Sequence, residues 1–185
     1  MTSERNNMYR NLFSGIAVMV LLLAGCAPAK QVLQKKCLPS SQVYEKGTGI
    51  AVWDFEITSL NDDVHMNRFL SDKIIKRILK EGHYDLITRD RLLFLLQELN
   101  LGTSMLVDER TRLKIGKLAG VKLMVFGWVQ QLPDNSTLIK VDLLEVETGK
   151  ALNSVGKRYD VATYDLSEWL KTVEELTPEL FIICQ

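Results

Sequence analysis

The stretch Ile50-Ala51-Val52-Trp53-Asp54-Phe55 predicts the first strand of a globular domain that starts near Gly49. The two-residue period of a strand divides the side chains of this region between two faces. One face carries Ala51, Trp53, Phe55 and Ile57, and the other carries Val52, Asp54 and Glu56. Polar residues 61–63 then offer helix caps, and apolar residues recur at helical spacing from Phe69 to Leu79 before Gly82 ends the predicted helix. Tyr84 to Thr88 predicts a second strand, and a strand, a helix and a strand in this order favour a right-handed crossover with parallel pairing.

Two shorter helices are expected next. Asp90 is the expected N-cap of the first, which residues 100–102 end, and Asp108 is the expected N-cap of the second. Gly116 and Gly120 predict close packing of the second helix and its C-terminal stop.

Three further strands and a last helix complete the domain. Residues 123–129 are apolar almost throughout, which predicts a strand covered on both faces. Residues 138–146 predict the next strand, and Thr148-Gly149 signals a hairpin turn into a more polar edge strand over residues 151–159. Asp165 and Glu168 form a capping-box pattern before a helix, and Thr177-Pro178 can start another helical turn. The order β-α-β-α-α-β-β-β-α predicts an α/β fold, with helices packed on a mixed β-sheet.

The N-terminal region has the layout of an export signal. Arg5 and Arg10 precede an apolar run that is too short to span a membrane as a helix. The run ends in Leu23-Ala24-Gly25-Cys26, which resembles the lipobox of bacterial lipoproteins. We therefore expect residues 1–25 to be a signal peptide cleaved between Gly25 and Cys26, and Cys26 to carry the acyl chains that anchor the protein. The alternatives are an ordinary signal with a chance cysteine, or an uncleaved anchor.

Residues 26–47 are then the lipidated cysteine and a tether, and residues 48–185 are the domain. Ala27 follows the lipidated cysteine, and the absence of an aspartate there favours the outer membrane over the inner one. The whole chain has 23 basic and 23 acidic side chains; loss of the signal leaves 21 and 22, so no basic excess suggests nucleic acid as a partner. Cys37 and Cys184 remain as a pair in an oxidising compartment, where they form either a disulfide or two separate thiols.

Four segments together resemble the CsgG-like family, which comprises the curli-export channel lipoprotein and related outer-membrane lipoproteins. These segments are residues 50–55, residues 84–92, residues 108–127 (DERTRLKIGKLAGVKLMVFG) and residues 147–152. The family includes channel subunits, flagellar outer-membrane lipoproteins and activators of penicillin-binding proteins. The resemblance implies an α/β domain presented to the periplasm and a role in protein contact and assembly rather than one specific task.

Three roles follow from this resemblance. The first is a non-catalytic module, anchored to the outer membrane, that assembles with itself or docks a periplasmic or outer-membrane protein. The second is a subunit of a secretion channel, but channel members insert long hairpins of roughly twenty residues, and only nine residues separate Trp128 from Leu138. The third is an activator of a penicillin-binding protein, which the short tether with only Pro28 and Pro39 disfavours.

Few residues suggest catalysis or cofactor binding, and we expect no enzyme, no cofactor and no metal site. His65 and His83 are expected at the surface because neither has a metal-ligand spacing. Asp54 and Glu56 share the end of a strand, where α/β proteins often bind ligands, but a solvated strand end is the expectation because no other group converges on them. Trp53, Trp128 and Trp169 are expected in the core or at an interface.

Overall fold

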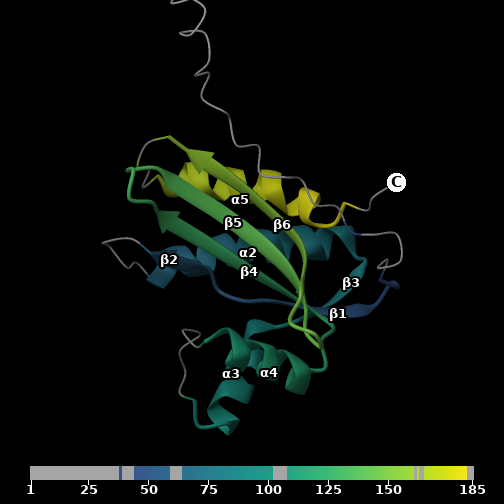
Figure 1. Ribbon diagram of the computed structural model, residues 1–185. Helices are drawn as coiled ribbons and strands as arrows, with labels where there is room; N and C mark the ends of the chain where they lie inside the picture. Colours follow the sequence, from purple (N-terminus) through teal and green to yellow (C-terminus); the bar gives the residue numbers. More distant parts are fainter. Residues whose placement is uncertain are drawn as a thin grey trace, which may run out of the picture. The chain divides into compact units, whose positions relative to one another are not determined.

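The computed structural model describes residues 38, 44–58, 64–101, 108–160, 162 and 165–182, all of which belong to one compact unit, Leu33–Gln185. Its centre is a six-stranded mixed sheet with the order β3-β1-β4-β5-β6, in which β2 also pairs with β4 (Figure 1). The strands are β1 (Thr48–Val52), β2 (Glu56–Thr58), β3 (Tyr84–Ile87), β4 (Leu123–Gln131), β5 (Thr137–Glu145) and β6 (Ala151–Tyr159). The predicted α/β class and element order are confirmed, with β1 parallel to β3 and with β6 at an edge.

The first strand differs from the prediction, because residues 53–55 divide it into β1 and β2. Both parts pair with β4 in parallel, with Val52 opposite Val125 and Glu56 opposite Trp128. Glu56 is thus four residues after Val52, whereas its partner Trp128 is only three residues after Val125. One extra residue therefore lies at the junction of β1 and β2. An extra residue reverses the faces of all that follows it, because side chains alternate along a strand. The prediction of one shared face was therefore wrong: Trp53 lies in the core beneath α3 and α4, and Phe55 in the core beneath α2 and α5.

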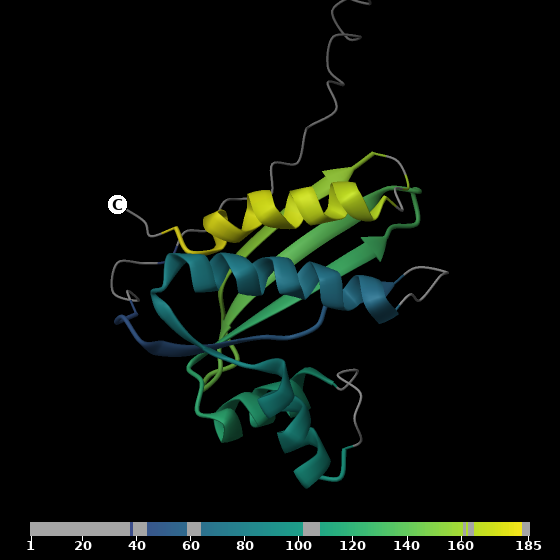
Figure 2. The same ribbon diagram turned by 180° about the vertical axis from the view of Figure 1, so that it is seen from behind.

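Two long helices, α2 (Val64–Glu81) and α5 (Leu166–Leu180), cover one face of the sheet, as Figures 1 and 2 both show. The core on this face includes Leu70, Ile74 and Ile78 of α2, all fully buried. Phe69 and Leu79, which the helical pattern also included, are 52% and 60% exposed. Thr177 and Pro178 lie within α5 instead of starting a new turn. None of the described helices is long and apolar enough to span a membrane.

The short helices α3 (Arg89–Glu98) and α4 (Glu109–Ala119) gather at one end of β4, β5 and β6 (Figure 1). Gly116 lets α4 approach the sheet closely, since a Cβ there would lie 2.5 Å from the Met124 sulfur. Gly120 ends α4 in the left-handed conformation, with φ of 76°. Both predictions about these glycines are confirmed.

The predicted helix caps have mixed outcomes. Asp108 accepts a hydrogen bond from the Thr111 backbone N–H, and Asp165 accepts one from the Ser167 N–H, so both are N-caps as expected. Asp90 is not a cap: α3 has Thr88 at its N-cap position, and Asp90 lies in the first turn. The caps expected at residues 61–63 lie outside the described residues.

Candidate functional site

The expected cleavage and lipidation residues, Gly25 and Cys26, lie outside the described residues, and so does the possible disulfide pair, Cys37 and Cys184. Their expected roles therefore remain predictions.

The two carboxylates at the β1–β2 junction do not share a face. Asp54 forms an ion pair with Arg89, the first residue of α3, and it also accepts a hydrogen bond from the Ser71 hydroxyl of α2 at 3.2 Å. The carboxylate side chain is only 14% exposed. Asp54 thus connects the sheet to two helices, and the expectation of a solvated strand end was wrong for this residue.

Glu56 points to the other side of the sheet, where three groups meet. It forms an ion pair with Arg112 of α4 and accepts a hydrogen bond from the Trp128 indole N–H at 3.1 Å. The Arg112 guanidinium carbon lies 5.9 Å from the ring centroid of Trp53 and 5.5 Å from that of Phe126, within cation–π range. Burial lowers the pKa of Arg112, although a guanidinium stays charged at any physiological pH.

The same network continues across the sheet from Trp128. The Lys140 ammonium lies 5.2 Å from the Trp128 ring centroid and 2.7 Å from a carboxylate oxygen of Asp142. Asp142 is 7% exposed, and its other oxygen accepts a hydrogen bond of 2.6 Å from Ser154 of β6. A chain of contacts thus links α4 to the edge strand through β2, β4 and β5.

This network borders a part of the sheet that no described helix covers, which we call the open sheet face. Figure 1 shows it in front of α2 and α5 and beyond the end where α3 and α4 pack. Cross-strand register aligns the side chains of this face in rows. Its members are Trp128, Gln130, Leu138, Lys140, Gly156 and Arg158.

A pocket of about 210 Å³ lies among the first four members of the open sheet face. An antiparallel sheet commonly has one solvated face with polar side chains. This face differs because the partly exposed side chains of Trp128 and Leu138 lie beside the amide of Gln130 and the ammonium of Lys140. That mixture suits contact with a protein surface, since aromatic residues are enriched in protein interfaces.

Sequence reasoning singled out Glu56 and Trp128 but missed Arg112, Lys140 and Asp142. Lys140 and Asp142 alternate with apolar residues along β5, which was a signal for a polar face. Nothing in the local sequence identified Arg112, because its partners come from distant strands.

Both histidines are exposed, as expected. His83 Nε2 lies 3.0 Å from the Tyr44 carbonyl oxygen, so this ring joins two loops. Within the described residues no group of three His, Cys, Asp or Glu side chains is arranged to hold a metal ion. Trp53 and Trp169 are buried in the core, and Trp128 is partly exposed.

Comparison with known sequences identifies one family. The family model described as "Curli production assembly/transport component CsgG" matches residues 43–139, just over half of the chain. No curated protein matches the sequence.

Comparison with solved structures identifies similar folds. The C-terminal domain of LpoB from Escherichia coli has a TM-score of 0.52 at 16% identity and covers 63% of this chain and 85% of that one. The corresponding LpoB domain from Salmonella enterica has a TM-score of 0.51 at 14% identity, covering 64% and 86%. The lipoprotein GNA1162 from Neisseria meningitidis has a TM-score of 0.47 at 15% identity, covering 71% and 96%. At these identities the LpoB domains are evidence about the fold alone.

Proposed function

Because this chain belongs to the CsgG family, we propose that it is a lipid-anchored protein of the outer membrane that docks a partner protein on its periplasmic side. In this role it is a non-catalytic interaction and assembly module for envelope biogenesis or for the export of surface structures. The acyl chains at Cys26 supply the anchor, and the domain from residue 48 onward supplies the contact surface.

The observation that carries the proposal is the open sheet face. Glu56 accepts a hydrogen bond from the indole N–H of Trp128, and the Lys140 ammonium lies against the indole ring. A partly exposed tryptophan whose orientation is fixed loses little conformational entropy when a partner covers it. Rigid aromatic side chains of this kind are common energetic centres of protein interfaces.

A photo-crosslinking experiment tests the proposal. We would place a photoreactive phenylalanine analogue at Gln130, which is exposed on the open sheet face, and in a matched variant at Lys171, which is exposed on α5. Irradiated cells should give a discrete adduct from position 130 that Trp128→Ala removes, and none from position 171. The same adducts from both positions, or an adduct that persists in Trp128→Ala, would show that this face is not the docking surface.

The anchor is tested separately. Cys26→Ala should abolish metabolic acyl labelling and release the protein from the outer-membrane fraction, because the lipobox cysteine is the only lipidation site that we expect. Undiminished label on the variant would refute the assignment of Cys26.

The channel role is the alternative within the family. The connection between β4 and β5 consists of residues 132–136 only, whereas a membrane-crossing hairpin needs roughly twenty residues. We therefore expect the purified lipidated protein to give no stepwise conductance in planar bilayers. Reproducible conductance steps would favour the channel role over docking.

A further inference from the structure

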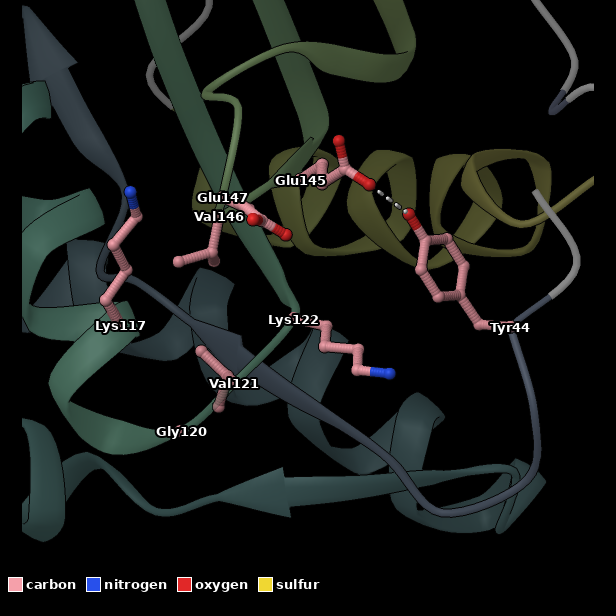
Figure 3. A pocket seen from close by; sticks show the side chains of 8 residues that line it. All are labelled: Tyr44, Lys117, Gly120, Val121, Lys122, Glu145, Val146 and Glu147. Carbon is pink, nitrogen blue, oxygen red and sulfur yellow. Dashed lines mark hydrogen bonds between the residues drawn. The ribbon is translucent and has the colours of Figure 1, made fainter.

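A second concave surface lies between the exposed side of α4 and the segment that joins β5 to β6. Two adjoining pockets form it, with volumes of about 580 and 380 Å³, and both are lined by Lys117, Val146 and Glu147. Figure 3 shows the larger pocket, with Lys117 and Lys122 on either side of Val121. We call this surface the α4 groove.

One wall of the α4 groove is basic. Arg110, Lys114 and Lys117 occur at intervals of four and three residues, so they project from the same side of α4. Lys122 adds a fourth cation just before β4. All four side chains are exposed, and none forms an ion pair with the residues that the structure describes.

The acidic residues on the opposite wall leave these cations largely uncompensated. One oxygen of Glu145 accepts a hydrogen bond from the Tyr44 hydroxyl at 3.2 Å, and the other accepts one from Thr148 at 2.7 Å. Burial and the neighbouring Glu145 raise the pKa of Tyr44 to about 12, so its hydroxyl remains a donor to this carboxylate. Glu147 is exposed and is the only other carboxylate among the described residues that line the groove.

We infer that the α4 groove binds an extended, acidic segment of a partner protein. Carboxylates on that segment would pair with the row from Arg110 to Lys117, and its apolar side chains would rest on Leu113 and Val146 between the walls. Seven residues of α-helix rise about 10 Å, which is the length of about three residues of extended chain. The groove is therefore long enough for two acidic side chains at alternate positions of one strand.

The shape of the groove favours a peptide over a membrane surface. A flat layer of anionic head groups could reach the exposed cations, but it could not enter a pocket of about 580 Å³ that is lined in part by the buried side chains of Val121 and Val146. Glu147 on the opposite wall of the groove would also repel such a layer. This surface is distinct from the open sheet face, so a partner could occupy either one alone.

The test measures binding of a fluorescein-labelled octapeptide of alternating Glu and Leu to the full chain in detergent, by fluorescence anisotropy. Lys114→Gln/Lys117→Gln should weaken binding about tenfold, since two exposed charge pairs with the peptide are lost. The matched control Lys76→Gln/Lys171→Gln removes the same charge from exposed positions on α2 and α5 and should change affinity by less than about twofold. Glu147→Gln should strengthen binding, because it removes a like charge from the groove.

Three outcomes would overturn the inference. The first is no measurable binding of the octapeptide, with circular dichroism showing that the chain is folded. The second is an equal loss in both lysine pairs, which would indicate attraction by net charge alone. The third is binding to phosphatidylglycerol vesicles that depends on Lys114 and Lys117 while peptide binding does not, which would assign the groove to the membrane. None of these outcomes affects the crosslinking result at the open sheet face.

Discussion

Replacing Arg112 by alanine should destabilise the domain by about 3 kcal/mol. The Arg112 side chain is 9% exposed and pairs with Glu56, which is 32% exposed. Breaking a buried ion pair by removing one partner costs about 3–5 kcal/mol, and the partial exposure of Glu56 places this pair at the lower end. The loss includes the contacts of the guanidinium with Trp53 and Phe126, which together hold α4 on the sheet.

Urea unfolding followed by tryptophan fluorescence measures this effect. The transition midpoint should fall with an unchanged slope, because the surface exposed on unfolding stays the same. The matched control is Lys73→Ala, which breaks the exposed pair with Glu174 and should cost no more than about 1 kcal/mol.

A double-mutant cycle then separates the ion pair from the packing. If Arg112 acts through Glu56, the cost of Arg112→Ala should be smaller in a Glu56→Gln background by at least about 1 kcal/mol. A cost below 1 kcal/mol for Arg112→Ala alone would refute the claim that this residue fastens α4. Strict additivity of the two substitutions would refute the ion pair as the cause.

Three further predictions concern other parts of the domain. Gly127→Ala should cost about 1–3 kcal/mol in urea unfolding, because a Cβ there would clash with the fully buried ring of Phe55. Phe55→Leu should recover part of the loss, and a neutral Gly127→Ala would contradict the packing. Tyr44 should titrate near pH 12, which the difference in ultraviolet absorbance between the protein and Tyr44→Phe would measure. Because its pKa is raised in the folded state, its contribution to stability is complete below pH 10 and is lost as the pH rises towards 12. A titration midpoint at pH 10 would contradict the burial of Tyr44 and its contact with Glu145. Cys37 and Cys184 should resist alkylation in the unfolded, unreduced protein, because Leu38, which follows Cys37, donates a backbone hydrogen bond of 2.8 Å to Ile182, two residues before Cys184. A disulfide closing so long a loop stabilises by about 5 kcal/mol in the chain-entropy model, and two reactive thiols would exclude it.

The elements that the sequence predicted correctly depend on short-range signals. Asp108 caps α4 because its carboxylate reaches an N–H three residues on, and Gly120 ends that helix through its own left-handed backbone. The turn between β5 and β6 likewise contains Gly149 with φ of 68°. Each of these features is determined within a few residues, so no knowledge of the fold is needed to recognise it.

The faces of β1 and β2 could not be predicted in the same way. The alternation from Ala51 to Ile57 is unbroken in sequence, yet Trp53 and Phe55 are buried on opposite sides of the sheet. The cause is the register with β4, which accommodates one extra residue between Val52 and Glu56. Register between strands that are distant in sequence depends on the whole sheet, and a periodicity argument assumes that it is regular.

The candidate site was predictable only in part for a related reason. Two carboxylates near a strand end were visible in the sequence, but whether they were solvated depended on Arg89 and Arg112, which belong to helices much further along the chain. Only the fold brings each carboxylate to its arginine, and it does so on opposite sides of the sheet. The cations of α4 are a different case, since their spacing on one helix face was visible while the groove beside them was not.

The exposure along β4 gives a physical reason for the position of the proposed docking surface. On the face that α4 covers, Met124 and Phe126 are buried, Trp128 is partly exposed and Gln130 is exposed. Gly116 holds α4 against Met124, and Arg112 extends the cover over Phe126. Trp128 is thus the first residue of the strand beyond the helix, yet it is still a large apolar side chain with a fixed orientation. The apolar pattern of the strand therefore continues past the cover that this chain provides, and a partner that packs on Trp128 would complete the missing part of that layer.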